Sequence, residues 1–403
     1  MGRGIADCLV LVFTEGVSLR AWANLGMLER EWALYRALGP QYGRLVLVTY
    51  GGRDDRAALE PELTPEESSK LTVVSNEDGL SPAEYLRTVP ARVRAAVAGC
   101  ESVVVKTNQM QGGEAAVEIT RALRASGCAA GLIARGGYLW TRFVAHEHGP
   151  QSAAALSAAQ RERALCQAAD IVVGTTGDMV DDLAWRYGLE PSRCVVVPNY
   201  VLLDVEPRAS EDREPGTLLY AGQLSKRKNV DLLVRAVALL PEERRRNVVL
   251  EIIGEGDQRG ALEKLAKELG APVRFRSRIP HRELVERMSR CTAYVQSSEL
   301  EGHPKTVLEA MAAGAPVLVV KAPGLAEVVT HGMNGLRVDA DPQALATAIE
   351  ELLNDAEWRD MLGCSAARTV RNEVGLPRIV EVETEVHKRA LAHASRSALR
   401  VSA

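Results

Sequence analysis

The sequence lacks several features that would each point to a particular class of protein. Its 53 acidic residues outnumber 49 basic ones, which leaves a formal net charge of -4 on 403 residues. A duplex-binding surface needs a basic field, so nucleic acid is not expected as a ligand. No apolar run approaches the roughly 18 to 20 residues that a membrane-spanning helix requires. We therefore expect a cytoplasmic protein.

Paired cysteines are also missing. No CxxC pair occurs among the seven scattered cysteines, Cys8, Cys100, Cys128, Cys166, Cys194, Cys291 and Cys364. This pattern predicts reduced thiols, with neither a disulfide framework nor a zinc site. His146 and His148 are close in sequence, but residues two apart do not share a helix face and no third ligand is evident. We predict no metal site.

What the chain does contain is an alternation of strand-like and helix-like segments. Short apolar runs in the first half predict parallel strands at residues 8–13, 44–50, 102–107, 129–134, 170–175 and 194–199. The pattern restarts at 217–222, 248–254, 273–277, 293–297, 316–320 and 335–338. Periodic helical stretches fall between these runs, so each half predicts a doubly wound α/β domain.

The length also favours two domains. A polar run at residues 205–216, bracketed by prolines, is the best candidate for a linker. We predict an N-terminal Rossmann-like domain at 1–203, a C-terminal one at 204–375, and a final helix with a tail at 376–403. That helix is expected to pack back on the N-terminal domain. In such sheets ligands bind beyond the carboxyl ends of the strands, so we expect a cleft there.

The segment "SSELEGHPKTVLEAMAAGAPVLVV", residues 297–320, follows one of these strands. Pro304 suits the first turn of a helix, where the N–H groups of Lys305 and Thr306 would then bind an anion such as phosphate. Glu301 and Glu309 flank this helix start and could receive the paired hydroxyls of a sugar and a ribose. The alternative is that Glu309 faces solvent and Glu301 is an ordinary loop acid.

This segment resembles the Glu-x7-Glu donor-binding motif of the retaining glycosyltransferases of family 4 (glycosyltransferase group 1). The resemblance implies the GT-B fold, two Rossmann-like domains facing a central cleft. It also implies that Glu301 contacts the transferred sugar and that Glu309 holds the ribose of the nucleotide. The loop residues implied to meet the sugar and diphosphate are Gly302, His303, Pro304, Lys305 and Thr306.

The segment "LLYAGQLSKRKN" is similar to another part of the family's donor site. The resemblance places Lys228 on the leaving diphosphate, beside Gly222. Gln223 stands where the family usually has an arginine, and Lys226 or Arg227 could supply the missing charge. It also places the backbone of Ile279 against the base.

Glycines elsewhere carry weaker signals. Gly254 and Gly256 follow a strand and suggest a dinucleotide site, but the acid expected about 20 residues later is absent. Gly16 follows the first strand, where the resemblance implies a loop facing the diphosphate and acceptor.

The first half departs from the family at residues 106–109. Many members have a histidine after this strand, whereas this chain has Lys106, Thr107, Asn108 and Gln109. Asn108 is our catalytic candidate there. A retaining transfer can proceed without a separate base, because the departing phosphate oxygen can take the proton of the acceptor.

Two aromatic segments are candidates for acceptor or membrane contact. Arg135, Tyr138 and Trp140 could form an acceptor surface, or the start of a half-buried helix. Trp22 and Trp32 lie at helical spacing with Tyr35 in a helix expected over residues 18–38. Core packing is favoured for them, and peripheral contact with the inner membrane is the alternative.

The sequence therefore predicts a retaining, metal-independent hexosyltransferase that moves a sugar from a UDP- or GDP-sugar to a saccharide or lipid-linked acceptor. Bacterial envelope polysaccharide synthesis is the expected context. The nucleotide sugar is a co-substrate, and no cofactor is expected. The alternative is a catalytically degenerate GT-B protein that only binds nucleotide sugars or glycans.

Overall fold

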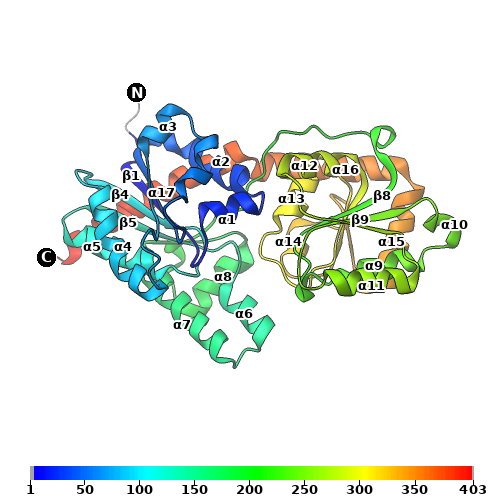
Figure 1. The fold of residues 1–403 in the computed structure, drawn as a ribbon, viewed down its shortest axis with the longest axis horizontal. Helices are drawn as coiled ribbons and strands as arrows, with labels where there is room; N and C mark the ends of the chain where they lie inside the picture. The colour runs from blue at the N-terminus through cyan, green and yellow to red at the C-terminus, as the bar shows by residue number, and fades with distance from the viewer. Residues whose placement is uncertain (1–3, 402–403) are drawn as a thin grey trace. The chain divides into compact units, whose positions relative to one another are not determined.

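The computed structural model describes the backbone of residues 4–401 and side chains up to residue 395. The chain forms two compact units (Figure 1). The first unit comprises the chain up to Pro198 together with the stretch from Ile379 onward, and the second spans Asn199–Arg378. The sequence placed these boundaries near residues 203 and 375. The end of the predicted tail, residues 402–403, lies outside the described residues.

The first unit is built on a parallel sheet with strand order β3-β2-β1-β4-β5-β6-β7. Its strands are β1 (Ala6–Val12), β2 (Tyr42–Val48), β3 (Leu71–Val74), β4 (Ser102–Thr107), β5 (Ala129–Arg135), β6 (Ile171–Gly174) and β7 (Cys194–Val196). Every predicted strand is present. One strand of this sheet, β3, was not predicted; it is an edge strand of four residues.

Helices cover both faces of this sheet. They are α1 (Leu19–Asn24), α2 (Leu28–Leu38), α3 (Pro65–Lys70), α4 (Pro82–Ala96), α5 (Glu114–Ala125), α6 (Trp140–His148), α7 (Ala153–Ala168), α8 (Gly177–Tyr187) and α17 (Leu376–Val401). Because side chains alternate along a strand, Val103 and Val105 of β4 join the core shared with α4 and α5. Lys106 points to the opposite face, where it meets α2 and α17.

The single helix expected over residues 18–38 is two helices. Gly26 has a φ of 65° and separates α1 from α2, a conformation that favours glycine. Trp22, Trp32 and Tyr35 are all buried, and Trp22 stacks on Phe13 with ring centroids 4.2 Å apart. These tryptophans therefore serve the core, and the suggested membrane contact through them is wrong.

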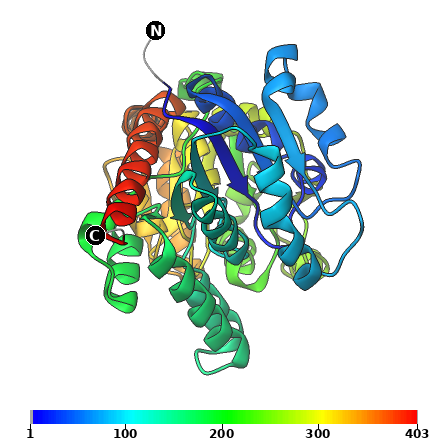
Figure 2. The same cartoon turned by 90° about the vertical axis from the view of Figure 1, so that its left-hand side faces the viewer.

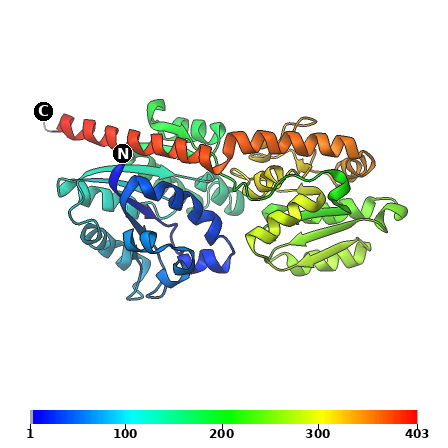
Figure 3. The ribbon, with the colours of Figure 1, turned by 90° about the horizontal axis from the view of Figure 1, so that it is seen from above.

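The C-terminal helix α17 lies along the first unit (Figures 2 and 3). Buried charged side chains join the two. Lys106 Nζ donates to Glu383 Oε1 at 2.5 Å, and both side chains are inaccessible to solvent. His387 lies one turn further along, with Nε2 facing Glu383 Oε2 at 3.2 Å. The hydroxyl oxygen of Tyr42 lies 2.5 Å from Nδ1 of His387. Burial lowers the pKa of His387, so the neutral imidazole is favoured.

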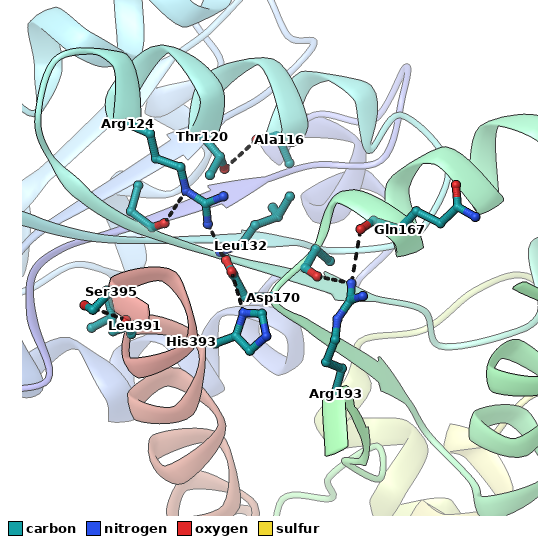
Figure 4. A network of polar contacts seen from close by, with 12 residues as sticks. Ala116, Thr120, Arg124, Leu132, Gln167, Asp170, Arg193, Leu391, His393 and Ser395 are labelled. Carbon is teal, nitrogen blue, oxygen red and sulfur yellow. Dashed lines mark hydrogen bonds and ion pairs between the residues drawn. The ribbon is translucent and has the colours of Figure 1, made fainter. Parts of the chain in front are cut away.

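A second contact fixes the far end of α17 (Figure 4). Asp170 accepts from the backbone N–H of Leu132 at 2.7 Å and from Arg124 at 2.5 Å, and His393 Nδ1 lies 3.0 Å from its other oxygen. Gly131 permits the helix to approach, since a Cβ there would lie 2.8 Å from the backbone of Ala390.

The second unit repeats the doubly wound plan, with strand order β10-β9-β8-β11-β12-β13. Its strands are β8 (Glu214–Ala221), β9 (Val249–Ile253), β10 (Val273–Arg276), β11 (Cys291–Gln296), β12 (Val317–Val320) and β13 (Leu336–Val338). Its helices are α9 (Asp231–Leu239), α10 (Glu242–Arg245), α11 (Arg259–Leu269), α12 (His281–Arg290), α13 (Lys305–Ala312), α14 (Leu325–Val328), α15 (Pro342–Asn354) and α16 (Ala356–Val374). In Figure 1, α9 and α11 lie on one side of the strands and α12 and α16 on the other.

The polar run at 205–216 is packed against the second unit and does not form a free linker. The Arg213 side chain is buried and donates to the backbone carbonyls of Ser289 and Gly314. Arg208 pairs with Glu286 at 2.7 Å. The prolines marked an irregular segment correctly, but its charged side chains find partners on the second unit. Within the described residues no helix is long and apolar enough to cross a membrane.

Breaking the buried pair on α17 should destabilise the protein. Glu383→Leu leaves Lys106 buried without its anion, so the unfolding free energy should fall by about 3–5 kcal/mol in urea titrations. The double variant Lys106→Met/Glu383→Leu should recover most of that loss. Glu66→Leu, which breaks the exposed pair with Lys70, should leave the unfolding free energy nearly unchanged. A double variant no more stable than Glu383→Leu would contradict this account.

Candidate functional site

The strand order of the second unit identifies where a ligand should bind. β8 and β11 are neighbours, and the chain leaves them toward opposite edges of the sheet. The loops that follow two such strands diverge and leave a crevice at their carboxyl ends. The loop after β8 carries Gly222, Gln223 and Lys228, and the loop after β11 carries Glu301. Residues 73 positions apart are thereby brought together.

Glu301 is the centre of a charged cluster at this point. Its Oε1 accepts a hydrogen bond from Lys228 Nζ, and Gln296 Nε2 lies 3.3 Å from the same oxygen. The guanidinium of Arg227 lies 3.6 Å from Oε2. All these side chains are largely withdrawn from solvent. Glu301 is therefore a buried, paired carboxylate and not a solvated one.

Burial and charge act against each other in this cluster. Burial raises the pKa of Glu301, but Lys228 and Arg227 outweigh it, so the pKa lies below its ordinary value. Burial lowers the pKa of Lys228, against the opposing effect of Glu301. Two cationic side chains, Lys228 and Arg227, face the carboxylate, and such cations could also contact an anionic ligand.

The start of α13 lies beside this cluster. Pro304 is the N-cap, and Lys305 is the first helical residue, with its Nζ 5.9 Å from the centre of the Tyr200 ring. A helix N-terminus favours anions, because its first N–H groups and its dipole both point at the ligand. Thr306 follows in this first turn, as the sequence predicted.

His303 ties the loop to the start of the second unit. The backbone N–H of Asn199 donates to His303 Nδ1 at 3.0 Å, and the Asn199 side chain donates to the His303 carbonyl at 2.8 Å. Because Nδ1 accepts a hydrogen bond, the neutral imidazole carries its proton on Nε2. The loop that carries Glu301 and Gly302 is thus held in place through both the side chain and the backbone carbonyl of His303.

Glu309 lies inside the protein and does not face solvent. Its side chain is 3% exposed, and its Oε1 lies 3.0 Å from His281 Nε2. His281 comes from α12, and the sequence analysis did not single it out. Its place directly after Ile279 and Pro280 was the available signal, but no spacing rule connects it with a glutamate 28 residues later.

The glycines after β8 and β9 have a packing role. A Cβ on Gly254 would lie 1.9 Å from the carbonyl oxygen of Gly222, and one on Gly256 would lie 2.1 Å from that of Leu224. The two loops therefore touch through their backbones, which explains these glycines without a dinucleotide. Gln223 is exposed, and Ile279 packs partly buried against the core.

The remaining predicted residues lie in the first unit. Gly16 follows β1 with a φ of 77°, and Asn108 follows β4 with its N–H bonded to the Val12 carbonyl. Arg135 ends β5 and donates to the Asn108 carbonyl at 3.4 Å. These three residues lie at the carboxyl ends of neighbouring strands, as expected. Lys106 is committed to Glu383 and cannot take the place of the family's histidine.

The predicted aromatic surface is only partly available. Trp140 is buried, and the guanidinium of Arg161 lies 5.0 Å from the centre of its ring. Tyr138 packs against Phe143 with ring centroids 4.8 Å apart. The alternative of a half-buried helix start fits Trp140, which begins α6 and has little surface for stacking on a sugar.

No group of three or more His, Cys, Asp or Glu side chains in the described part of the chain is arranged to hold a metal ion. A hollow of about 510 Å³ lies between α9 and α11, lined by Lys226, Asp231, Arg235, Lys264 and Glu268 among others. It does not include Glu301, Glu309 or Lys228. Of the two cations proposed to replace the missing arginine, Lys226 faces this hollow and Arg227 faces Glu301.

Comparison with known families accounts for the second unit. Residues 205–369 match the family described as glycosyl transferases group 1. This range contains the loops after β8 and β11 and the whole of α13. The second unit is therefore a glycosyl transferases group 1 domain.

Curated relatives with detectable similarity include D-inositol 3-phosphate glycosyltransferases. The protein from Streptomyces avermitilis is 32% identical over 228 residues, which cover 51% of this chain and 49% of the relative. The protein from Frankia alni is 33% identical over 215 residues, covering 48% and 53%. The chain thus spans about half the length of the curated relatives it matches.

Solved structures share the fold of nearly the whole chain. Anabaena Alr3699/HepE in complex with UDP and glucose superposes with a TM-score of 0.73 at 17% identity, covering 94% of this chain and 98% of that one. Sucrose-phosphate synthase from Thermosynechococcus elongatus gives a TM-score of 0.75 at 20% identity, covering 96% and 99%. The predicted GT-B fold of two Rossmann-like domains is confirmed.

The loop carrying Glu301 rests on Gly324, which has a φ of 82°. A Cβ there would lie 2.5 Å from the carbonyl oxygens of both Glu301 and Gly302. Gly324→Ala should therefore displace the loop. If the site binds the nucleoside diphosphate that the family resemblance implies, this binding, measured by calorimetry, should weaken by about tenfold or more. Gly332→Ala is the matched control, because Gly332 has a φ of 75° but open space around its Cβ position. It should lower stability by about 1 kcal/mol and leave binding intact. Equal binding in both variants would contradict the prediction.

Proposed function

We propose that this chain, whose residues 205–369 form a glycosyl transferases group 1 domain, transfers a sugar from a nucleoside diphosphate sugar to an acceptor hydroxyl. One observation carries the proposal. At the point where the strand order of the second sheet reverses, a buried carboxylate paired with two cations adjoins a helix N-terminus. That combination suits a ligand that presents both hydroxyl groups and phosphates.

Each group has a role in this proposal. Lys228, Arg227 and the first N–H groups of α13 bind the diphosphate. Glu309 accepts hydrogen bonds from the ribose hydroxyls, and Glu301 accepts them from the transferred sugar. When the diphosphate enters, Lys228 can turn from Glu301 to a phosphate oxygen, which frees the carboxylate for the sugar. In this proposal the ion pair between Lys228 and Glu301 forms only while the substrate is absent.

The proposed chemistry is a retaining transfer that uses no metal ion. The bond between the sugar carbon and the diphosphate breaks, and the acceptor oxygen forms its bond on the same face of the sugar. The proton of the acceptor hydroxyl moves to the departing phosphate oxygen. Lys228 and Arg227 stabilise the charge that develops on the diphosphate, an electrostatic effect that is usually the largest in catalysis.

The acceptor is proposed to be a saccharide or a lipid-linked sugar, bound at the strand ends of the first unit near Gly16, Asn108 and Arg135. Bacterial envelope glycan synthesis in the cytoplasm is the proposed context, and no cofactor is required beyond the nucleotide sugar. The competing function is a binding protein without turnover. The exposed Gln223, in place of an arginine, is the observation that favours it.

The first test is a thermal-shift panel with UDP, GDP, ADP and NAD, followed by assays of nucleoside diphosphate release. A ligand at 100 times its dissociation constant should add about 2.7 kcal/mol of stability. A shift with one of UDP, GDP and ADP, with slow release from the matching nucleotide sugar, supports a transferase. A shift without release supports the binding protein. A shift with NAD alone contradicts both.

Substitutions at the two charged positions should have different effects. Glu309→Gln should weaken binding of the nucleoside diphosphate by about tenfold or more, since it removes a charged acceptor for the ribose. Lys228→Met should reduce kcat by about 100-fold or more, since it removes charge from the leaving group. Glu351→Gln and Lys264→Met, both at exposed positions of the same unit, are the controls. Wild-type kinetics in both site variants would refute the assignment.

A further inference from the structure

The pair formed by His281 and Glu309 has a property that the proposed function leaves unexplained. Glu309 is the one charged residue in α13 after Lys305, and its neighbours Val307, Leu308, Ala310 and Met311 are all buried. A carboxylate at such a position is costly to bury, and an apolar residue would fill the same space at lower cost. The chain keeps the carboxylate and supplies a partner for it from another helix.

The partner is held in place by its own surroundings. His281 is the first residue of α12, directly after the N-cap Pro280, and its side chain is 8% exposed. α12 anchors itself through buried Val285 and Met288 and packs against α13. The Nε2–Oε1 distance of 3.0 Å is that of an ordinary N–H···O hydrogen bond. The imidazole therefore fixes the orientation of the carboxylate.

We infer that His281 is a positioning residue that makes this site selective for ribonucleotides. By holding Oε1, the imidazole fixes the plane in which Glu309 accepts hydrogen bonds from the ribose hydroxyls. A carboxylate has about four lone-pair positions, so one bond from the imidazole does not exhaust its capacity to accept. The inference rests on the proposed function, because it presupposes that a nucleotide binds at Glu309.

A purely structural role for His281 would have a different signature. If the imidazole only neutralised a buried charge, its loss would destabilise the fold and weaken all ligands alike. If it orients Glu309, its loss should act mainly on ligands that carry the ribose 2′-hydroxyl. The decisive quantity is therefore the ratio between the affinities of a ribonucleotide and its 2′-deoxy counterpart.

The experiment is calorimetric titration of the full chain with UDP, GDP and ADP and with the 2′-deoxy form of whichever binds. The wild type should prefer the ribonucleotide by about tenfold or more, the range of a hydrogen bond to a charged group. In His281→Leu the preference should fall below about threefold, while affinity for the deoxynucleotide changes little. His281→Gln, which keeps an N–H donor, should retain part of the preference.

His331→Leu is the control for replacing a histidine in the same unit, since His331 is exposed and lies outside the site. It should leave the preference at the wild-type value. If His281→Leu folds, binds, and keeps the wild-type preference, the inference is wrong while the proposed function stands. If it weakens both nucleotides equally, His281 has only a structural role. If the wild type binds none of the three nucleotides, the proposed function fails and the inference fails with it.

Discussion

The reversal of strand order between β8 and β11 is the constraint on which the candidate site depends. Parallel strands present their carboxyl ends at one edge of a sheet, and neighbouring strands with diverging connections leave room between their loops. Lys228 and Glu301 meet there because the sheet places them there, although neither is near the other in sequence. The glycines at 254 and 256 let the adjacent loop close against the same edge.

Buried charged side chains occur in both units. Their surroundings indicate whether each cluster stabilises the fold or belongs to the candidate site. Lys106, Glu383, His387 and Tyr42 form a network sealed from solvent, in which each group serves to fasten α17. The second cluster keeps some exposure to solvent and consists of Lys228, Arg227 and Glu301. It lies at the carboxyl edge of a sheet, which is where ligands bind in folds of this kind. Glu309 is more deeply buried still and pairs with His281, and we infer that this pairing bears on specificity.

Local patterns in the sequence were sufficient to predict most of the fold. The structure contains every predicted strand. The prediction succeeded because apolar runs between helical segments are a strong signal for parallel sheets that helices cover on both faces. The four-residue β3 was too short to stand out, and Gly26 was not recognised as a break between α1 and α2. The family motif located Glu301, Glu309 and Lys228. The sequence did not predict the burial of Trp140 or the partners of Lys106 and Glu309. These features depend on contacts between distant segments, and the periodicity of a single sequence carries no signal for such contacts.

A crystal structure of the full chain with bound UDP, GDP or ADP would test the central claim most directly. The account predicts that the ribose contacts Glu309 and that the phosphates lie between Lys228 and the start of α13. A nucleotide bound instead in the hollow between α9 and α11, or at the strand ends of the first unit, would contradict it.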